Sequence, residues 1–330
     1  MEKRRLPGTE IEITPIVFGA FAIGGWFWGG TEDEQAVSAV HAALDQGVNA
    51  IDTAPVYGMG HSEELVARAI SGRRHTVVVL TKFGMRWDGA EGVFTFDTKD
   101  NTGKPVQVYK FAGKKSVLEE CERSLHRLRT DYIDLYQLHW PDKTTPVAET
   151  MEALELLLEQ GKIRAAGVCN YPADLLEEAS SRIIIASNQV AYSMLNRQVE
   201  LDLVPRCRKS GIGILAHTVL QKGLLAGKIH PGHQFNAGDH RPSNPYFKEA
   251  NLARLYPLLH ALEEIAAARE TSLAQLAVNW TINRPGITAA LVGARNPEQA
   301  LENAKAAGFR LSEEECRRIE ELLGQLQLDL

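Results

Sequence analysis

Residues 48–58, VNAIDTAPVYG, hold the pattern that decides the fold. A short, largely apolar run ends on the carboxylate of Asp52, and a loop that carries Tyr57 follows it directly. Helical periods separate this run from seven similar ones, at residues 16–19, 77–82, 133–139, 164–169, 183–189, 213–217 and 289–293. Eight strands that alternate with helices predict an α/β protein built as a closed (β/α)8 TIM barrel.

Capping signals support this register of strands and helices. Three Ser/Thr–Glu pairs have the spacing of a capping box at a helix start: Thr31 with Glu34, Ser116 with Glu119, and Ser312 with Glu315. Proline in the first helical turn and glycine after the last one mark further ends, at Pro146, Pro297, Gly47 and Gly161. No linker-like tract interrupts the pattern, so residues 1–330 are predicted to form a single domain.

Three segments lie outside the repeat. Residues 1–13 are expected to form an N-terminal β-hairpin around Pro7 and Gly8 that caps one barrel mouth. Residues 86–113 and 229–250 are rich in turn-forming residues and are expected to be long loops. Each follows a strand, so both are expected at the C-terminal face of the barrel, which carries active sites.

Composition limits the classes of partner. The formal net charge is −6 and 44% of residues are hydrophobic, values typical of globular proteins that bind neither nucleic acid nor membranes. The charged first residues contain no secretory signal, so a cytoplasmic location is expected. The cysteines are scattered and expected to be reduced, and the His230/His233 pair lacks further ligands, so no metal site is predicted. Whether the chain forms a homo-oligomer is left open.

Four ionisable residues fall at the ends of consecutive strands. Asp52 ends the second predicted strand, Lys82 the third and His139 the fourth, while Tyr57 lies just after Asp52. Because neighbouring strand ends converge in a barrel, these side chains are expected to meet at one site. Any one of them alone could equally serve packing or a structural ion pair, but their joint placement indicates proton transfer.

The chemistry of the four groups is complementary. A phenol with an ordinary pKa of about 10 transfers protons poorly near neutral pH unless its environment changes that value. Lys82 is therefore expected to lower the pKa of Tyr57, while Asp52 keeps Lys82 charged and His139 binds a carbonyl oxygen. Such a group suits protonation of an oxygen atom while hydride reaches the adjoining carbon.

At these residues the sequence resembles the aldo-keto reductase superfamily over nearly its whole length. The matching motifs, in chain order, are NAIDTAPVYG (49–58), VLTKF (79–83), DYIDLYQLHWP (131–141), GKIRAAGVCNY (161–171), NQVAY (188–192) and QKGLLAGK (221–228). The resemblance implies NADPH-dependent reduction of small aldehydes and ketones to alcohols. It assigns the acid role to Tyr57, with support from Lys82, Asp52 and His139.

The resemblance also implies positions that contact NADP(H). Asn170 and Gln189 match the residues that hold the nicotinamide carboxamide, Cys169 replaces a more usual serine, and His217 replaces an aromatic residue that stacks on the nicotinamide. The pyrophosphate loop corresponds to residues 218–228, with Thr218, Leu220, Lys222, Gly223, Leu225, Gly227 and Lys228 as contacts.

The adenosine end is expected at the helix that follows Gly293. Arg295, beside the N-terminus of this helix, is assigned to the 2′-phosphate, and Gln299, Glu302 and Asn303 are assigned to the adenine. Because other family members carry basic residues where this chain has Gly293 and Gln299, a preference for NADP over NAD is expected without being strict. A solvated surface arginine is the simpler alternative for Arg295.

The proposed reaction places the carbonyl carbon near the nicotinamide, in a substrate pocket walled by Trp28, Trp87 and Trp140, where packing in the barrel is an equal alternative. Two other functions remain open. A regulatory binding module similar to potassium channel β subunits would share the fold and the cofactor. A Schiff-base aldolase-type barrel would use Lys82 as its nucleophile.

Overall fold

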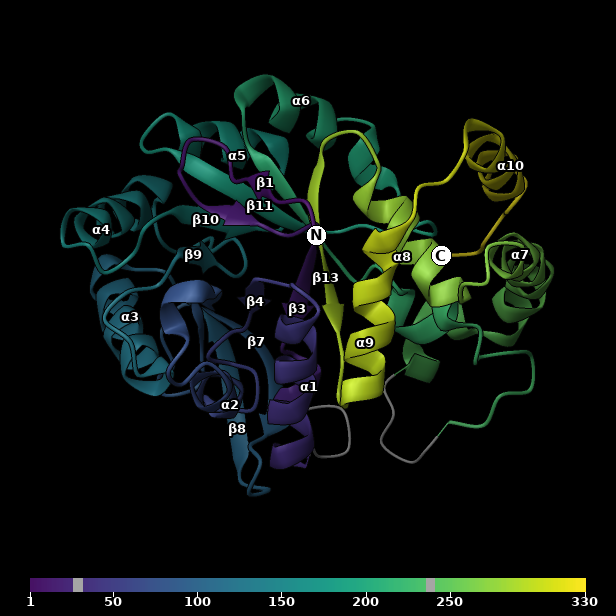
Figure 1. Cartoon of the computed structure of the whole chain (residues 1–330). Coiled ribbons are helices and arrows are strands. Elements are labelled where there is room, and N and C mark those ends of the chain that lie inside the picture. Colours follow the sequence, from purple (N-terminus) through teal and green to yellow (C-terminus); the bar gives the residue numbers. More distant parts are fainter. Residues whose placement is uncertain (26–31, 236–240) are drawn as a thin grey trace.

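The computed structural model describes residues 1–25, 32–235 and 241–330. At its centre eight parallel strands form a closed barrel in chain order (Figure 1). These are β3 (Ile16–Gly19), β4 (Ala50–Asp52), β5 (Val78–Phe83), β9 (Leu135–Leu138), β10 (Ala166–Cys169), β11 (Ile185–Ala191), β12 (Gly213–His217) and β13 (Ile287–Gly293). Each overlaps one of the predicted runs, so the (β/α)8 prediction is confirmed.

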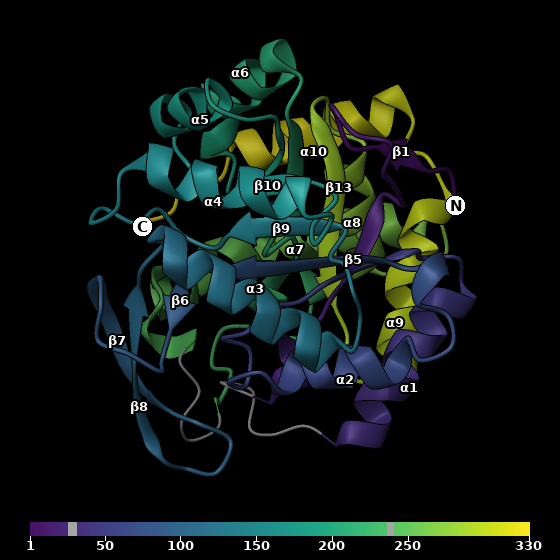
Figure 2. The ribbon, with the colours of Figure 1, turned by 90° about the vertical axis from the view of Figure 1, so that its left-hand side faces the viewer.

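Helices surround the barrel (Figures 1 and 2). In the described residues they are α1 (Asp33–Asp45), α2 (His61–Ala69), α3 (Lys114–Leu128), α4 (Val147–Glu159), α5 (Ala173–Ser180), α6 (Leu203–Ser210), α7 (Glu249–Ala267), α8 (Leu273–Ile282), α9 (Pro297–Lys305) and α10 (Glu313–Gly324). None of these helices is long and apolar enough to span a membrane.

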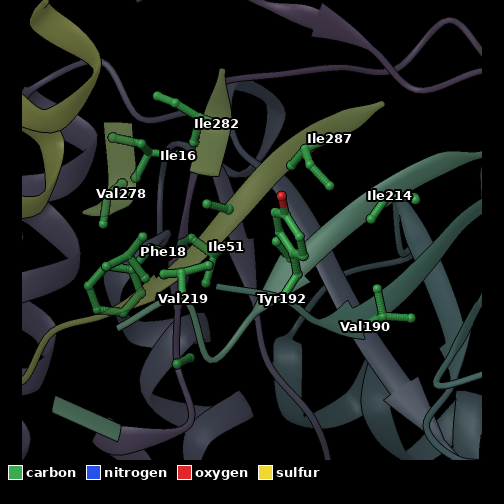
Figure 3. Close-up of a cluster of buried hydrophobic side chains, with 14 of the residues drawn as sticks. Ile16, Phe18, Ile51, Val190, Tyr192, Ile214, Val219, Val278, Ile282 and Ile287 are labelled. Carbon is green, nitrogen blue, oxygen red and sulfur yellow. The ribbon is translucent and has the colours of Figure 1, made fainter. Parts of the chain in front are cut away.

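Successive side chains along each strand point alternately to the two faces of the barrel wall, and this separates two apolar cores. In β3, Ile16 and Phe18 point outward and pack with Val278 and Ile282 of α8 in the larger cluster between strands and helices (Figure 3). Val17 points inward and joins an apolar cluster inside the barrel. This period of two is what a barrel buried on both faces requires.

The predicted N-terminal hairpin is present and closes the barrel end where the strands begin. It consists of β1 (Arg4–Arg5) and β2 (Glu12–Ile13), which pair antiparallel. Leu6 and Ile13 are fully buried and belong to the inner cluster. The Arg4 guanidinium donates hydrogen bonds to backbone carbonyls at residues 282, 287 and 288. Apolar side chains therefore plug the end of the barrel where the strands begin.

Residues 86–113 are not the long loop that was expected. Strands β7 (Val93–Lys99) and β8 (Pro105–Lys110) form an antiparallel hairpin, and β6 (Met85–Arg86) pairs with β8. At the turn, the Asp100 carboxylate accepts bonds from the backbone N–H groups of Thr102 and Lys104, and Gly103 has a φ of 86°. Such a turn brings two β-prone runs together, so the segment becomes a sheet. Residues 229–250 contain short 3-10 helices, η5 (Arg241–Ser243) and η6 (Pro245–Phe247), in their described part.

Helix starts follow the capping predictions unevenly. The capping box of Ser312 and Glu315 opens α10, and Asn296 with Pro297 opens α9, as predicted. The box at Ser116 is wrong: α3 begins at Lys114, and the Ser116 hydroxyl donates to the buried Glu120 carboxylate instead.

The remaining predictions concern two helix starts, at Pro146 and Thr31, and two helix ends. Pro146 precedes α4 as its N-cap rather than occupying its first turn. Thr31 lies outside the described residues, and Glu32 is the N-cap of α1. Gly47 and Gly161 have φ values of 83° and 68°, as expected after helix ends.

Candidate active site

The structure brings the four predicted proton-transfer residues together at the C-terminal ends of the strands. Asp52 ends β4, Lys82 lies near the end of β5, and His139 follows β9 directly. Strands β4, β5 and β9 are neighbours in the barrel. Tyr57 lies in the loop between β4 and α2.

Lys82 is the centre of the cluster. Its side chain is fully buried, and Nζ donates to Asp52 Oδ2 at 2.6 Å, to the backbone oxygen of Thr53 at 2.9 Å and to the Tyr57 hydroxyl oxygen at 3.3 Å. Burial alone would lower the pKa of Lys82, but the negative charge of Asp52 raises it above its ordinary value. The ammonium group therefore stays charged beside the phenol.

Two glutamines hold the second oxygen of Asp52. Gln189 Nε2 donates to Asp52 Oδ1 at 2.8 Å, and Gln137 Nε2 donates to the same oxygen at 3.3 Å. The sequence interpretation missed Gln137, although its position two residues before His139 on one strand face could have indicated it. In the structure Gln189, which the resemblance assigns to the cofactor, also orients Asp52.

The expected lowering of the Tyr57 pKa is wrong for this structure. Burial raises the pKa of Tyr57 to about 12, while Lys82 acts in the opposite direction with a smaller effect. The Tyr57 ring packs against Phe21, with ring centroids 4.9 Å apart, and against an apolar cluster that includes Val56 and Val108. This apolar surround disfavours a phenolate, so the Tyr57 hydroxyl keeps its proton.

His139 stands edge-on to Tyr57. The two ring centroids are 5.7 Å apart and the planes make an angle of 80°. Burial lowers the pKa of His139 well below its ordinary value, and the nearby Lys82 lowers it further. The imidazole is therefore neutral and can donate one hydrogen bond without carrying charge.

Asn170 and His217 form a second group beside the cluster. Asn170 has a φ of 58° and its Nδ2 donates to the backbone oxygen of His139 at 3.2 Å. A His217 ring nitrogen lies 3.4 Å from Asn170 Oδ1, and the other lies 2.8 Å from the Thr218 hydroxyl. Burial lowers the pKa of His217 to about 4, so it too is neutral. Cys169 is a free, buried thiol beside them.

Residues 218–228 form a tightly curled loop after β12. Thr218, Gln221 and Lys222 have positive φ values although none is glycine, and Gly223 follows with a φ of 95°. Backbone held in such conformations costs free energy and is concentrated at ligand sites. Leu225 is fully buried, Leu220 and Gly223 are partly buried, and Gly227 and Lys228 are exposed.

The start of α9 carries the predicted adenosine residues. Arg295 is exposed just before the helix, and the backbone N–H of Arg295 donates a hydrogen bond to Gln299 Oε1 at 2.9 Å. Glu302 accepts from the Ser272 hydroxyl at 2.7 Å, and Asn303 donates to the Gly293 carbonyl at 3.0 Å. The last two side chains thus have structural hydrogen bonds of their own.

The three predicted pocket tryptophans have different positions. Trp87 packs against the apolar cluster beside Tyr57. Trp140 is 37% exposed, and Lys110 Nζ lies 4.6 Å from its ring centroid, so it belongs to the outer rim. Trp28 lies outside the described residues. Among residues 1–25, 32–235 and 241–330, no group of three or more His, Cys, Asp or Glu could hold a metal ion.

Fold and site together define a class: a (β/α)8 barrel in which a half-buried tyrosine, a buried Lys–Asp pair and a neutral histidine meet where the strands end. The chain belongs to the aldo-keto reductase family, because the sequence model of the family described as "Aldo/keto reductase family" matches residues 15–323. Oxidoreductases of this family are its relatives. It is 34% identical to the NADH-specific methylglyoxal reductase of Escherichia coli (strain K12), over 99% of this chain and 100% of that protein.

Two solved structures show the same fold. A glycerol dehydrogenase from Gluconobacter oxydans superposes with a TM-score of 0.90 at 34% identity, covering 99% of this chain and 97% of that one. An aldo-keto reductase from Klebsiella pneumoniae, solved in complex with NADPH, has a TM-score of 0.74 at 29% identity, with 100% of both chains covered.

Proposed function

We propose that the protein reduces aldehydes and ketones to alcohols with NADPH and that Tyr57 is the general acid. The observation that carries this proposal is the chain of contacts from the buried Asp52 through the buried Lys82 to the half-buried Tyr57 hydroxyl, at 2.6 Å and 3.3 Å. Because the phenol oxygen accepts a bond from the ammonium group, its own proton can be donated to a substrate oxygen. We also infer that residues 1–330 act as one domain in the cytoplasm.

The chain's residues divide the work at the carbonyl oxygen. Bound NADPH supplies the hydride. Tyr57 donates its proton to the oxygen, and the charge of Lys82 stabilises the phenolate that remains. His139, being neutral, donates a hydrogen bond that orients the carbonyl. Asp52 keeps Lys82 in place, and Trp87 supplies an apolar wall.

The residues present fit an extended dinucleotide along the barrel rim. Asn170 follows β10, Gln189 lies in β11, His217 ends β12 and Arg295 follows β13. These strands are consecutive in the barrel, so the residues mark successive points on one arc. The strained loop at Lys222 and the N-terminus of α9 lie on the same arc and suit phosphates.

Arg295 supports a preference for NADPH, since a guanidinium beside a helix N-terminus suits the 2′-phosphate. The solved relative from Klebsiella pneumoniae holds NADPH, whereas the relative from Escherichia coli is named as NADH-specific. Both cofactors therefore belong in every assay.

The alternative in which Lys82 forms a Schiff base fits poorly. That chemistry needs a neutral amine, whereas Asp52 raises the pKa of Lys82. A purely regulatory role does not require a protonated tyrosine beside the ion pair.

Replacing Tyr57 with phenylalanine tests the proposal. Tyr57→Phe removes the proton donor but keeps the ring, so reduction of an aromatic aldehyde panel should fall by at least about a hundredfold. Cofactor affinity, measured by fluorescence titration with NADPH and with NADH, should stay within about twofold because the hydroxyl is not assigned to the cofactor. Normal turnover by this variant would remove Tyr57 from its role.

A further inference from the structure

The turn of the β7–β8 hairpin touches the loops around Tyr57. Asn101, in this turn, donates from Nδ2 to the backbone oxygen of Gly24 at 3.1 Å. Gly24 is the last residue of η1 (Ala22–Gly24), which follows β3. The hydrogen bond therefore joins segments 77 residues apart in sequence.

Two glycines allow three backbone segments to meet at this point. A Cβ atom on Gly58, directly after Tyr57, would lie 2.2 Å from the Gly24 oxygen and 2.9 Å from Asn101 Nδ2. A Cβ atom on Gly24 would lie 2.9 Å from the Tyr57 carbonyl carbon. The Asn101 amide thus sits where the η1 loop and the Tyr57 loop are in contact.

One face of the hairpin is apolar and lies beside the Tyr57 ring. Phe96 and Val108 are cross-strand partners, so their side chains share a face. Val108 is fully buried in a cluster with Val56, and Phe96 and Tyr57 both pack against that cluster. The apolar face of the hairpin and the Tyr57 ring therefore belong to one apolar cluster.

The other end of the hairpin is fixed by charge. Arg86 donates to Asp88 and to the Ser116 hydroxyl at 2.9 Å each, and Ser116 donates to the buried Glu120. The Asp88 carboxylate also accepts from Arg123 of α3. Since the base is fixed to α3, the position of the far end depends on contacts such as that of Asn101.

We propose that Asn101 is a positioning and specificity-determining residue that holds the β7–β8 hairpin as a fixed wall beside Tyr57. With the wall in place, the site takes slender, unbranched carbonyl compounds in preference to bulky ones. This inference rests on the proposed role of Tyr57 in carbonyl reduction.

Asn101→Asp tests the inference because it keeps the side-chain shape and replaces the amide donor with a carboxylate. We expect the ratio of kcat/KM for 4-tert-butylbenzaldehyde to that for propanal to rise about three- to tenfold, as loss of one hydrogen bond allows. The change should lie in KM for the bulky aldehyde, while kcat for propanal stays within about twofold.

Gln107→Ala is the matched control. It removes two exposed bonds on the hairpin face opposite Val108: the one that Gln107 donates to Asp97 and the one that it accepts from the Tyr109 hydroxyl, each at 3.0 Å. This variant should leave the substrate ratio unchanged. An equal change of the ratio in both variants would overturn the proposal, because general loosening of the hairpin would explain it.

Hydrogen exchange of the free protein gives a readout independent of turnover. Amides of residues 96–108 should exchange faster in Asn101→Asp than in the wild type. Unchanged exchange would show that Asn101 does not hold the hairpin, and faster exchange with an unchanged ratio would overturn its role in specificity. If the wild type reduces neither aldehyde, the proposed function fails, while the exchange result still decides whether Asn101 holds the hairpin.

Discussion

Tyr57 and Lys82 respond differently to the loss of solvent around them. Both are desolvated, but the neighbours of Lys82, with the Asp52 carboxylate at 2.6 Å foremost, together raise its pKa, whereas the nearest charge to Tyr57 compensates only in part. The two positions could be predicted from strand ends in the sequence. The direction of the Tyr57 shift could not, because it depends on the packing of Phe21 and Val108, which are distant in the chain.

A pKa of about 12 for Tyr57 predicts opposite pH profiles for the two reaction directions. With Tyr57 in its proposed role, reduction needs the phenol, which is the dominant form at every pH below that value, so kcat/KM for reduction should be flat from about pH 6 to 9. Alcohol oxidation needs the phenolate, whose fraction rises about tenfold per pH unit in this range. Initial rates in both directions at constant ionic strength test this expectation.

The Lys82→Met variant is the control for these profiles. Lys82 lowers the pKa of Tyr57, so the removal of Lys82 should raise that pKa further. Alcohol oxidation by the variant should therefore be slower than in the wild type at every pH below about 10. A reduction rate in the wild type that falls tenfold between pH 7 and 8 would contradict the assignment of a high pKa to Tyr57.

At the scale of elements, period-two and helical patterns predicted all the barrel strands, but their ends shifted by up to a few residues. The errors have physical causes. Ser116 has the right spacing for a cap, yet its hydroxyl serves the buried Glu120, and the β7–β8 hairpin depends on the turn at Asp100 and Gly103 rather than on a periodic pattern. Tertiary contacts decided these cases.

Glu120 links α3 to the end of β5 and makes stability depend on pH. Its carboxylate accepts from the Gly84 backbone N–H at 3.0 Å, and burial raises the pKa of Glu120 to about 7. The folded state therefore keeps a proton that the unfolded chain loses above its ordinary pKa. The free energy of unfolding should fall as pH rises from about 4.5 to 7, and stay lowered above that.

Glu120→Gln does not titrate and still presents an oxygen to Gly84. The free energy of unfolding of this variant, minus that of the wild type, should increase between pH 5 and pH 8 by up to about 3 kcal/mol. Urea titrations at both pH values give the difference. If the two proteins keep a constant offset from pH 5 to 8, the raised pKa of Glu120 is wrong.

At the scale of the whole molecule, the barrel separates stability from chemistry. The hairpin plug fills one end with Leu6 and Ile13, and the Tyr57 cluster occupies the other. The sequence predicted this division, since strand ends and the Pro7-Gly8 turn are local signals. The apolar face that the β7–β8 hairpin places beside Tyr57 could not be predicted, because it depends on where residues 86–113 fold.

Leu6→Ala tests the separation. Leu6 is fully buried, so its truncation should lower the free energy of unfolding by about 2–5 kcal/mol. Because the plug lies at the end of the barrel away from Tyr57, kcat/KM at 25 °C should remain within about twofold. Urea unfolding and steady-state rates on the same preparation check both parts. A large loss of kcat/KM in fully folded protein would show that the two ends are coupled.

The pairing of β3 with β13 has a consequence for synthesis on the ribosome. Val17 lies beside Leu291, so one neighbour of the first barrel strand is translated after all the other barrel strands. Arg4 likewise finds its carbonyl partners only at residues 282–288. A nascent chain truncated before β13 would expose an open sheet edge, and such edges recruit other chains into aggregates. Chaperone capture of stalled intermediates should therefore persist until the last strand emerges from the exit tunnel.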